Sequence, residues 1–129
     1  NIELNIDVQA DTPPVLADRS QLERVFINLL GNAAKFTPQN GKITIKARAK
    51  EAMVKIDISD NGIGMPQDAI DKLFQEFYRV DNPINQQVKG TGLGLSLVKH
   101  IIEAHKGKIW VESKPDQGST FSFTLPAKY

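Results

Sequence analysis

The sequence has no cysteine, which excludes disulfide bonds, thiolate chemistry and cysteine-ligated zinc. It has only two histidines, His100 and His105, and neither has a carboxylate in a plausible relay, so a catalytic triad and a metal cage find no support. No charge of one sign prevails: 16 basic against 15 acidic residues give a formal charge of +1, and nucleic acid is not an expected partner. No apolar run approaches the ~20 residues that cross a bilayer, and no signal peptide opens the chain.

What is present fits one soluble globular domain. The chain of 129 residues is long enough for a single core and short for two. It has no internal repeat, low-complexity tract or linker, so we predict a single domain over residues 1–129. Because the first residue is Asn1 and not Met, we expect the chain to be a piece of a longer protein, and we expect this piece to be monomeric.

The first elements are predicted from hydrophobic periodicity. Residues 2–8 alternate strictly, with Ile2, Leu4, Ile6 and Val8 on one side, which predicts a half-buried strand. Asp18 can cap a helix, and apolar residues then repeat at helical spacing from residue 22 to residue 33.

The remaining elements alternate between helices and strands. Pro66 suits the first position of a helix whose apolar stripe includes Phe74 and Phe77, whereas residues 80–91 lack periodicity and predict a mobile loop. A third helix is expected to begin within residues 92–95 and to stop at Gly107. Further strands are predicted at 42–49, 53–59, 108–113 and 119–125, the first two joined as a β-hairpin. Together these elements predict an α+β fold, a two-layer sandwich of a mixed, mostly antiparallel sheet with three helices on one face.

The first chemical motif lies on the long helix. Asn28 and Asn32 are four residues apart, hence on one helical face, and Lys35 follows one turn later. An amide oxygen can bind Mg²⁺, and a lysine can bind a phosphate. Taken alone, the segment equally fits two asparagines that cap nearby backbone. The glycine–lysine pairs at 41–42 and 107–108 lack the remaining residues of a P-loop, and the motifs of a Ser/Thr/Tyr protein kinase are absent.

Two glycine-rich segments supply the other motifs. Asp60 follows a β-branched strand and precedes Gly62 and Gly64, so its carboxylate could accept a hydrogen bond from an exocyclic amine such as that of adenine. The segment GTGLGL, residues 90–95, opens a helix, where free backbone amides favour phosphates. Alone, the first segment equally fits a common turn and the second a flexible hinge.

Taken in order, the motifs resemble the ATP-binding domain of bacterial sensor histidine kinases. The matching segments are an asparagine box, NLLGNAAK at 28–35, a first glycine box, DNGIG at 60–64, an F box from Phe74 to Arg79, and the second glycine box at 90–95. The family belongs to the GHKL superfamily, with type II topoisomerases, MutL-type repair proteins and large heat-shock chaperones, whose module has the Bergerat fold. The resemblance covers essentially the whole chain, to the closing segment Gly118-Ser119-Thr120-Phe121.

The resemblance implies ATP and Mg²⁺ as ligands and a role for each matched position. Asn32 would coordinate Mg²⁺ between the phosphates, with Asn28 assisting from the same face and Lys35 contacting phosphate. Asp60 would bind the adenine amino group. The base pocket would further include Gly62 and Gly64, with Ser119 as a water-mediated second partner.

The resemblance also assigns the segment that would close over the nucleotide. Residues 80–91 would form an ATP lid, with Tyr78 and Arg79 at its hinge and Arg79 facing the γ-phosphate. The other nucleotide contacts would come from Lys89, Gly90, Thr91, Gly92, Leu93, Gly94 and Leu95.

A histidine kinase is favoured over a hydrolase by the residue at one helical position. The ATPases of the superfamily place a glutamate on this helix as a general base for water, whereas here the position holds Asn28, whose amide cannot take a proton. A histidine acceptor, with an unperturbed pKa of ~6.5, needs little deprotonation. Catalysis would then rest on positioning and on charge from Mg²⁺, Lys35 and Arg79.

The acceptor histidine itself is missing, because neither His100 nor His105 resembles the phosphorylated box of this family. The resemblance therefore implies a separate dimerisation and phosphoacceptor domain, a response regulator downstream, and a cytoplasmic domain in a membrane-anchored parent. We expect the chain to bind ATP·Mg²⁺ without phosphorylating itself. Two alternatives stay open: an anti-sigma-factor-type serine kinase, and a nucleotide-sensing interaction module in which ATP only orders the lid.

Overall fold

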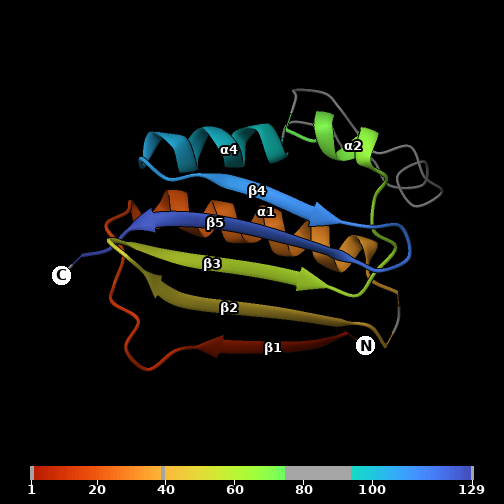
Figure 1. Ribbon diagram of the computed structural model, residues 1–129, viewed down its shortest axis with the longest axis horizontal. Helices are drawn as coiled ribbons and strands as arrows, with labels where there is room; N and C mark the ends of the chain where they lie inside the picture. The colour runs from red at the N-terminus through yellow and green to blue at the C-terminus, as the bar shows by residue number, and fades with distance from the viewer. Residues whose placement is uncertain (1, 39, 75–93, 129) are drawn as a thin grey trace.

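A computed structural model of the chain describes residues 2–38, 40–74 and 94–128. In this part of the chain, five strands form one sheet and three helices cover it (Figure 1). The strands are β1 (Glu3–Val8), β2 (Lys42–Lys50), β3 (Met53–Asp60), β4 (Ile109–Ser113) and β5 (Ser119–Pro126). The helices are α1 (Arg19–Phe36), α2 (Gln67–Lys72) and α4 (Gly94–Ala104).

The sheet has the strand order β1-β2-β3-β5-β4. Strand β1 runs parallel to β2, and the other three neighbouring pairs are antiparallel. The parallel pair follows from the connection between its strands, because α1 carries the chain back across the sheet before β2 begins. The predicted mixed, mostly antiparallel sheet with helices on one face is confirmed.

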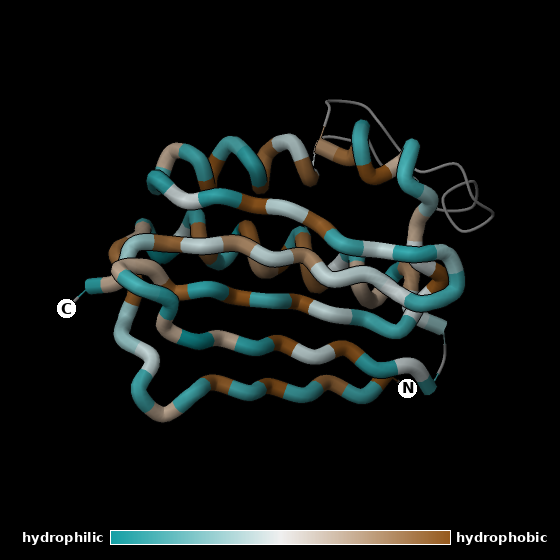
Figure 2. Tube along the Cα trace, in the orientation of Figure 1, coloured by the Kyte–Doolittle hydropathy of each residue, from teal (hydrophilic) through white to brown (hydrophobic). Residues whose placement is uncertain are grey.

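The core lies between the helices and the inner face of the sheet. Val25 and Leu29 of α1, Ile58 of β3, Val98 of α4 and Phe123 of β5 are each at most 1% exposed. The buried residues of α1 and β5 follow the periods expected for helix and strand, so these elements bury an apolar side. Figure 2 shows apolar and polar residues alternating along the strands. Packing of α1 and α4 on the central strands fixes the end of the sheet at which the chemical motifs meet.

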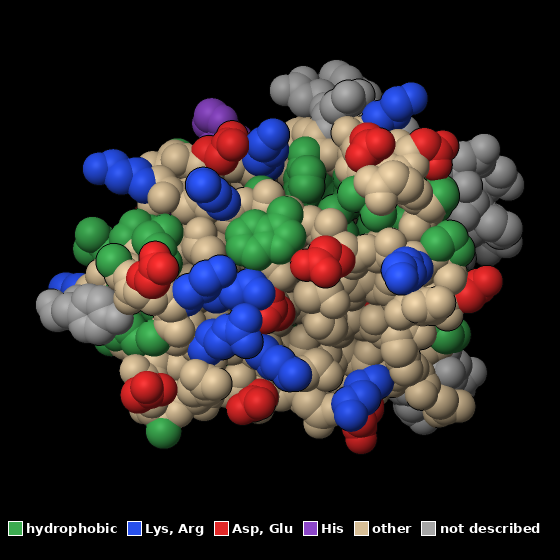
Figure 3. All heavy atoms as spheres, viewed as in Figure 1, with side chains coloured by type: hydrophobic (Ala, Val, Ile, Leu, Met, Phe, Trp, Pro, Cys, Tyr) green, Lys and Arg blue, Asp and Glu red, His purple; other side chains and the backbone are tan. Residues whose placement is uncertain are grey.

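The opposite face of the sheet is open and polar. Basic side chains gather there, as the space-filling view shows (Figure 3). Lys55 Nζ lies 3.5 Å from a carboxylate oxygen of Asp57 and 5.6 Å from the centroid of the Trp110 ring. The Asp57 carboxylate also accepts a hydrogen bond of 2.6 Å from the Ser122 hydroxyl. Side-chain contacts therefore join β3 to β5 and to β4 on this open face.

The start of α1 and the end of α4 are joined through His105. Asp18 caps α1 as predicted, its carboxylate accepting the Ser20 N–H at 3.2 Å. The Asp18 backbone N–H donates to His105 Nε2 at 3.1 Å, while His105 Nδ1 contacts the carbonyl oxygen of Ile101 at 2.8 Å. Because a carbonyl can only accept and an amide N–H can only donate, these two contacts use Nδ1 as the donor and Nε2 as the acceptor.

The predicted burial of β1 is wrong. Leu4, Ile6 and Val8, on the side expected to be buried, are 53%, 65% and 55% exposed. The reason is the position of the strand: β1 lies at the edge of the sheet and pairs only with β2, and the helices pack on the central strands. Alternation in a sequence cannot distinguish an edge strand from a central one.

Two helix boundaries also differ in detail. Pro66 is the N-cap of α2 rather than its first helical residue. The left-handed residue after α4 is Lys106, with φ 66°, and not Gly107. Gly107 is required for a different reason, because a Cβ at this position would stand 1.9 Å from the carbonyl oxygen of Thr124. Among the described residues, no helix is both long and apolar enough to span a membrane.

Candidate functional site

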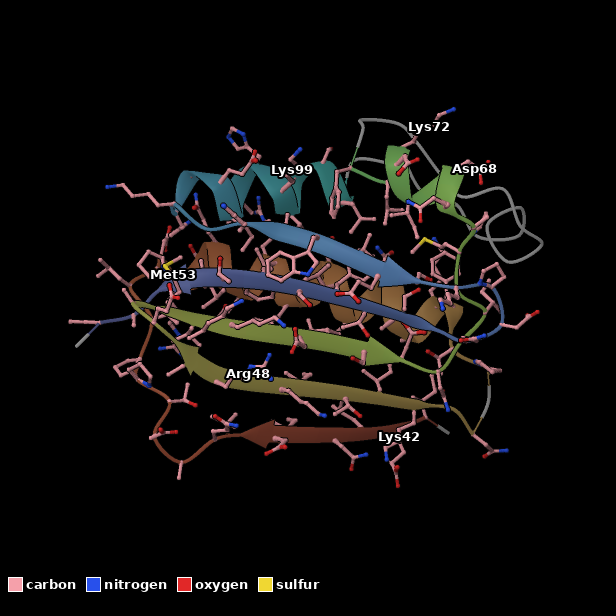
Figure 4. The ribbon with its side chains drawn as sticks, viewed as in Figure 1. Lys42, Arg48, Met53, Asp68, Lys72 and Lys99 are labelled. Carbon is pink, nitrogen blue, oxygen red and sulfur yellow. The ribbon has the colours of Figure 1, made fainter. Side chains whose placement is uncertain are left out.

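The elements that carry the predicted site residues meet at one end of the sheet, where Asp60 and Ser119 line a pocket that the asparagine box does not line. The carboxyl ends of β3 and β4, the beginning of β5, the last turn of α1 and the first turn of α4 meet there (Figure 1). In Figure 4 this is the end of β2 near Lys42, whereas Arg48 and Met53 lie toward the opposite end of the sheet. The topology thus brings together segments that are far apart in the sequence.

A row of three polar side chains crosses this end of the sheet. Asp60 is paired with Ser119 across β3 and β5, and Ser119 is paired with Ser113 across β5 and β4. Paired residues of neighbouring strands point to the same face, so all three side chains lie on the helix-covered side. We name Asp60, Ser119 and Ser113 the polar row.

The polar row lies in a pocket of about 370 Å³ between the sheet and α2. This volume is within the range of small-molecule sites, roughly 300–1,000 Å³. Gln67 and Ile70 of α2 line its other side. The charged residues of this helix, Asp68, Asp71 and Lys72, are all exposed, and Figure 4 labels Asp68 and Lys72. Most of the lining residues are polar, and Ile70 and Val111 supply the apolar side chains.

Asp60 has a perturbed carboxyl group. Burial raises its pKa, and the backbone N–H groups of Gly62 and Ser119 lower it by a smaller amount. The Gly62 N–H donates to Asp60 Oδ1 at 2.9 Å. These bonds orient the carboxylate and leave it able only to accept further hydrogen bonds.

The glycines of the first glycine box allow close backbone contacts around Asp60. A Cβ at Gly62 would stand 2.2 Å from the carbonyl oxygen of Phe36, the last residue of α1. Gly64 has φ 67°, and a Cβ there would stand 1.8 Å from the Lys114 carbonyl oxygen. The two glycines therefore let the loop after β3 pack directly on α1 and on the β4–β5 turn.

Two residues of the site, Ser113 and Gly118, received no site role from the sequence. Ser113 lies in the polar row, and its Oγ accepts the Met65 N–H at 2.9 Å. Gly118 has φ 85°, and a Cβ there would stand 2.0 Å from the Asp60 carbonyl oxygen. Ser113 ends a predicted strand, and its position beside Ser119 could have been found only from the strand register.

The asparagine box lies along α1 beside the start of α4. Asn28, Asn32 and Lys35 are all half-buried, at the border of the core face. A Cβ at Gly94 would stand 3.4 Å from Asn28 Oδ1, so the two helices approach closely at this position. Lys35 Nζ lies 5.4 Å from the centroid of the Phe36 ring. Leu95, also half-buried, packs against the core.

Some predicted site residues lie outside the described ranges. These are the lid segment 80–91 with Tyr78, Arg79, Lys89, Gly90, Thr91, Gly92 and Leu93. Phe77, of the predicted second-helix stripe, also lies outside them. Their roles remain predictions.

The described residues suit a metal ion that binds mainly through the phosphates of a nucleotide, with one or two protein oxygens. None of these residues form a group of three or more His, Cys, Asp or Glu side chains able to hold a metal. Mg²⁺ commonly keeps several waters and binds through substrate phosphates with one or two protein oxygens. An amide oxygen such as that of Asn32 suits this role, which needs no cage of carboxylates.

A family model and several sensory kinases match the chain. The family model described as "Histidine kinase-, DNA gyrase B-, and HSP90-like ATPase" matches residues 17–129. The adaptive-response sensory kinase SasA of Synechocystis sp. is 43% identical over 127 residues, covering 98% of this chain and 33% of the kinase. The SasA of Synechococcus elongatus is 44% identical over 125 residues, covering 96% and 32%. The chain thus spans about a third of the length of these curated relatives.

Solved structures match the fold over nearly the whole chain. The nucleotide-free catalytic domain of histidine kinase ThkA has a TM-score of 0.83 and 34% identity, covering 98% of this chain and 80% of that one. Full-length ShkA in complex with AMPPNP has a TM-score of 0.84 and 31% identity, covering 100% of this chain and 26% of that one. The predicted Bergerat fold is confirmed by this likeness to histidine kinase catalytic domains.

Proposed function

Because the chain belongs to the family of histidine kinase-, DNA gyrase B- and HSP90-like ATPases, we propose that it binds ATP with Mg²⁺ and supplies the γ-phosphoryl group to a histidine on a separate domain. In the transfer, a histidine nitrogen forms a bond to the γ-phosphorus while the bond to the bridging oxygen breaks, and ADP leaves. The observation that carries the proposal is the polar row at the end of a pocket of about 370 Å³.

The polar row suits an adenine base. The Asp60 carboxylate, buried and fixed by backbone N–H groups, can accept a hydrogen bond from an exocyclic amine. Ile70 of α2 offers an apolar contact for a flat ring. The glycines at 62 and 64 bring backbone close to this position without side chains in the way.

The asparagine box suits the phosphates. We assign Asn32 as the protein ligand of Mg²⁺, Asn28 as its neighbour on the same helical face, and Lys35 as a phosphate contact. Arg79, Tyr78 and the lid segment 80–91 are assigned by resemblance alone. The ion, when bound, would neutralise charge that develops on the transferred phosphoryl group.

Asn28 favours transfer to histidine over hydrolysis. Its amide cannot take a proton from water. Its Oδ1 lies beside the start of α4, where a Cβ at Gly94 would stand 3.4 Å away. A serine hydroxyl would need a base for the same reason, which argues against the serine-kinase alternative.

The histidines of the chain do not suit the acceptor role. Both ring nitrogens of His105 are occupied, by the Asp18 N–H and the Ile101 carbonyl. His100 is exposed on α4, and the residues around it do not resemble the phosphorylated box of the family. We therefore expect no phosphohistidine on the chain itself.

Phosphoryl transfer to a second protein tests the proposal. The chain is incubated with γ-labelled ATP and Mg²⁺, alone and with a histidine-bearing dimerisation domain of a related kinase added separately. Label on the added domain and none on the chain supports the kinase. Tight ATP binding with no transfer would instead support the nucleotide-sensing module, and label on the chain would contradict our assignment of the acceptor. Asn32→Ala is the control, since loss of the Mg²⁺ ligand should abolish transfer.

The proposed partners follow from the proposed histidine kinase activity. We propose that the phosphoacceptor domain belongs to the same parent protein and that a response regulator receives the phosphoryl group from it. One matching structure is described as histidine kinase ThkA in complex with response regulator protein TrrA. The membrane anchor expected for the parent gains no support from the relatives, and it forms no part of the proposal.

A further inference from the structure

We infer that Ser113 is a positioning residue that fixes the hydroxyl of Ser119 as a hydrogen-bond acceptor and so helps the pocket select adenine over guanine. The inference rests on the proposed function, since it concerns the nucleotide base that the same pocket binds. It adds to that function a residue remote from the phosphates and a physical source of base selectivity.

Ser113 Oγ has three close polar neighbours. It lies 2.9 Å from the carbonyl oxygen of Gly118, 2.9 Å from the backbone nitrogen of Met65 and 2.7 Å from the Oγ of Ser119. A serine hydroxyl has one proton to donate and two lone pairs to accept with. Three neighbours therefore account for all of its hydrogen-bonding capacity.

The direction of each bond follows from the chemistry of the neighbours. The Gly118 carbonyl can only accept, so the Ser113 proton points to it. The Met65 N–H can only donate, so it occupies one lone pair of Ser113 Oγ. The second lone pair remains for Ser119, and in that contact Ser119 is the donor.

The Ser119 hydroxyl consequently offers only lone pairs to the pocket. Its single proton is directed at Ser113, and Ser119 is 8% exposed, so bulk water does not compete freely for that proton. The neighbouring Asp60 carboxylate also offers only lone pairs when ionised. The polar row therefore presents acceptors alone at the end of the pocket.

A row of acceptors discriminates between purines. Adenine carries an amine at its sixth position, which donates two hydrogen bonds, whereas guanine carries a carbonyl oxygen there, which only accepts. An oxygen facing two acceptors would leave buried polar groups unpaired, which costs more than a missing contact at an exposed site. Without Ser113, the Ser119 hydroxyl could turn and donate to guanine.

The test compares the binding of ADP and GDP, which differ only in the base. Isothermal titration is performed on the wild type, Ser113→Ala, Ser119→Ala and the double variant. We expect Ser113→Ala to reduce the ratio of ADP to GDP affinity about three- to tenfold, the effect of one ordinary hydrogen bond. In the Ser119→Ala background the same change should leave the ratio unaltered, because no hydroxyl remains to turn.

Three controls separate positioning from a loss of structure. Ser113→Thr keeps the hydroxyl and should restore the ratio of the wild type. Ser122→Ala removes another buried serine of β5, whose hydroxyl bonds Asp57 on the open face, and should not change the ratio. Thermal unfolding of each variant shows whether loss of the acceptor for the Met65 N–H disturbs the fold.

The outcomes distinguish this inference from the proposed function. If Ser113→Ala lowers the ratio equally with and without the Ser119 hydroxyl, Ser113 acts by supporting the fold and the inference is wrong. If Ser113→Ala leaves the ratio unchanged, the inference is also wrong, while ATP remains the ligand. A wild type that binds ADP and GDP equally, or neither, would instead contradict the proposed function.

Discussion

At the scale of single residues, Asp60 illustrates how binding and stability oppose each other. Burial raises the pKa of its carboxyl group, so the folded chain holds the proton more tightly than the unfolded chain. Stability from this group is present at acidic pH and is lost as pH rises through the raised pKa. Above the raised pKa the ionised carboxylate therefore destabilises the nucleotide-free chain, although it is this form that we propose to accept a hydrogen bond from an amine.

We expect Asp60→Asn to weaken ADP binding about 10- to 100-fold, because a hydrogen bond to a charged acceptor is lost. The nucleotide-free variant should be at least as stable as the wild type at neutral pH, and its stability should depend less on pH across the acidic range. Titration calorimetry and denaturant unfolding at several pH values measure both effects.

Asp68→Asn is the matched control for that comparison, because it makes the same chemical change at an exposed position of α2. It should alter neither ADP affinity nor the pH dependence of stability. A variant at Asp60 that bound ADP as tightly as the wild type would remove the carboxylate from the site.

At the scale of elements, stability depends differently on the cap of α1 and on the edge strand of the sheet. Helix α1 supplies the asparagine box at one end and depends on the Asp18 cap at the other. Strand β1, by contrast, contributes exposed apolar side chains and no residue of the pocket lining described above.

Asp18→Ala should lower the free energy of unfolding by about 1 kcal/mol, the usual effect of losing an N-cap. The carboxylate bond to Ser20 disappears, while the Asp18 backbone bond to His105 can persist in the variant. Chemical denaturation measures the change, and Asp18→Asn, which keeps a capping oxygen, should recover most of it. Equal losses in both variants would point to a different cause.

Threonine substitutions should separate the edge of the sheet from its centre. Ile6→Thr should change the free energy of unfolding by no more than about 0.5 kcal/mol, because Ile6 is 65% exposed. Ile58→Thr should cost about 2 kcal/mol or more, since Ile58 is 1% exposed and the variant buries a hydroxyl. Similar losses at both positions, in the same denaturation assay, would mean that something covers β1 in solution.

The same contrast explains which parts of the structure were predictable. Periodicity and capping residues are local, so the hairpin, α1 and the α+β layers could be read from the sequence. The exposure of β1 and the place of Ser113 depend on which strands become neighbours, and that is decided by long-range packing. A glycine is required at position 107, as predicted, but the reason is different. A side chain there would collide with the backbone of Thr124 on a distant strand.

At the scale of the whole molecule, the described residues pack as one sheet with three helices, and a pocket lies at one end of the sheet. The loop after β3 and the β4–β5 turn are tied together, the Asp116 N–H donating to the Ile63 carbonyl at 2.6 Å. Gly64 and Gly118 permit this contact, and the pocket lies beside it. Nucleotide binding should therefore stabilise the molecule as a unit.

We expect ADP at about 100 times its dissociation constant to stabilise the wild type by ~2.7 kcal/mol, which raises the melting temperature by roughly 10 °C. The shift should grow with the logarithm of ligand concentration and should be much smaller in Asp60→Asn. Differential scanning calorimetry over a ligand series measures it. A shift that saturates at low concentration and is identical in Asp60→Asn would place the nucleotide elsewhere.

The edge position of β1 separates the beginning of the sheet from the polar row. The strand bonds to β2 on one side only, and its apolar side chains face water, so little free energy resists its local opening. The polar row is carried by β3, β5 and β4, which remain paired when β1 leaves. A force on the first strand would therefore detach β1 from β2 and leave the polar row in place.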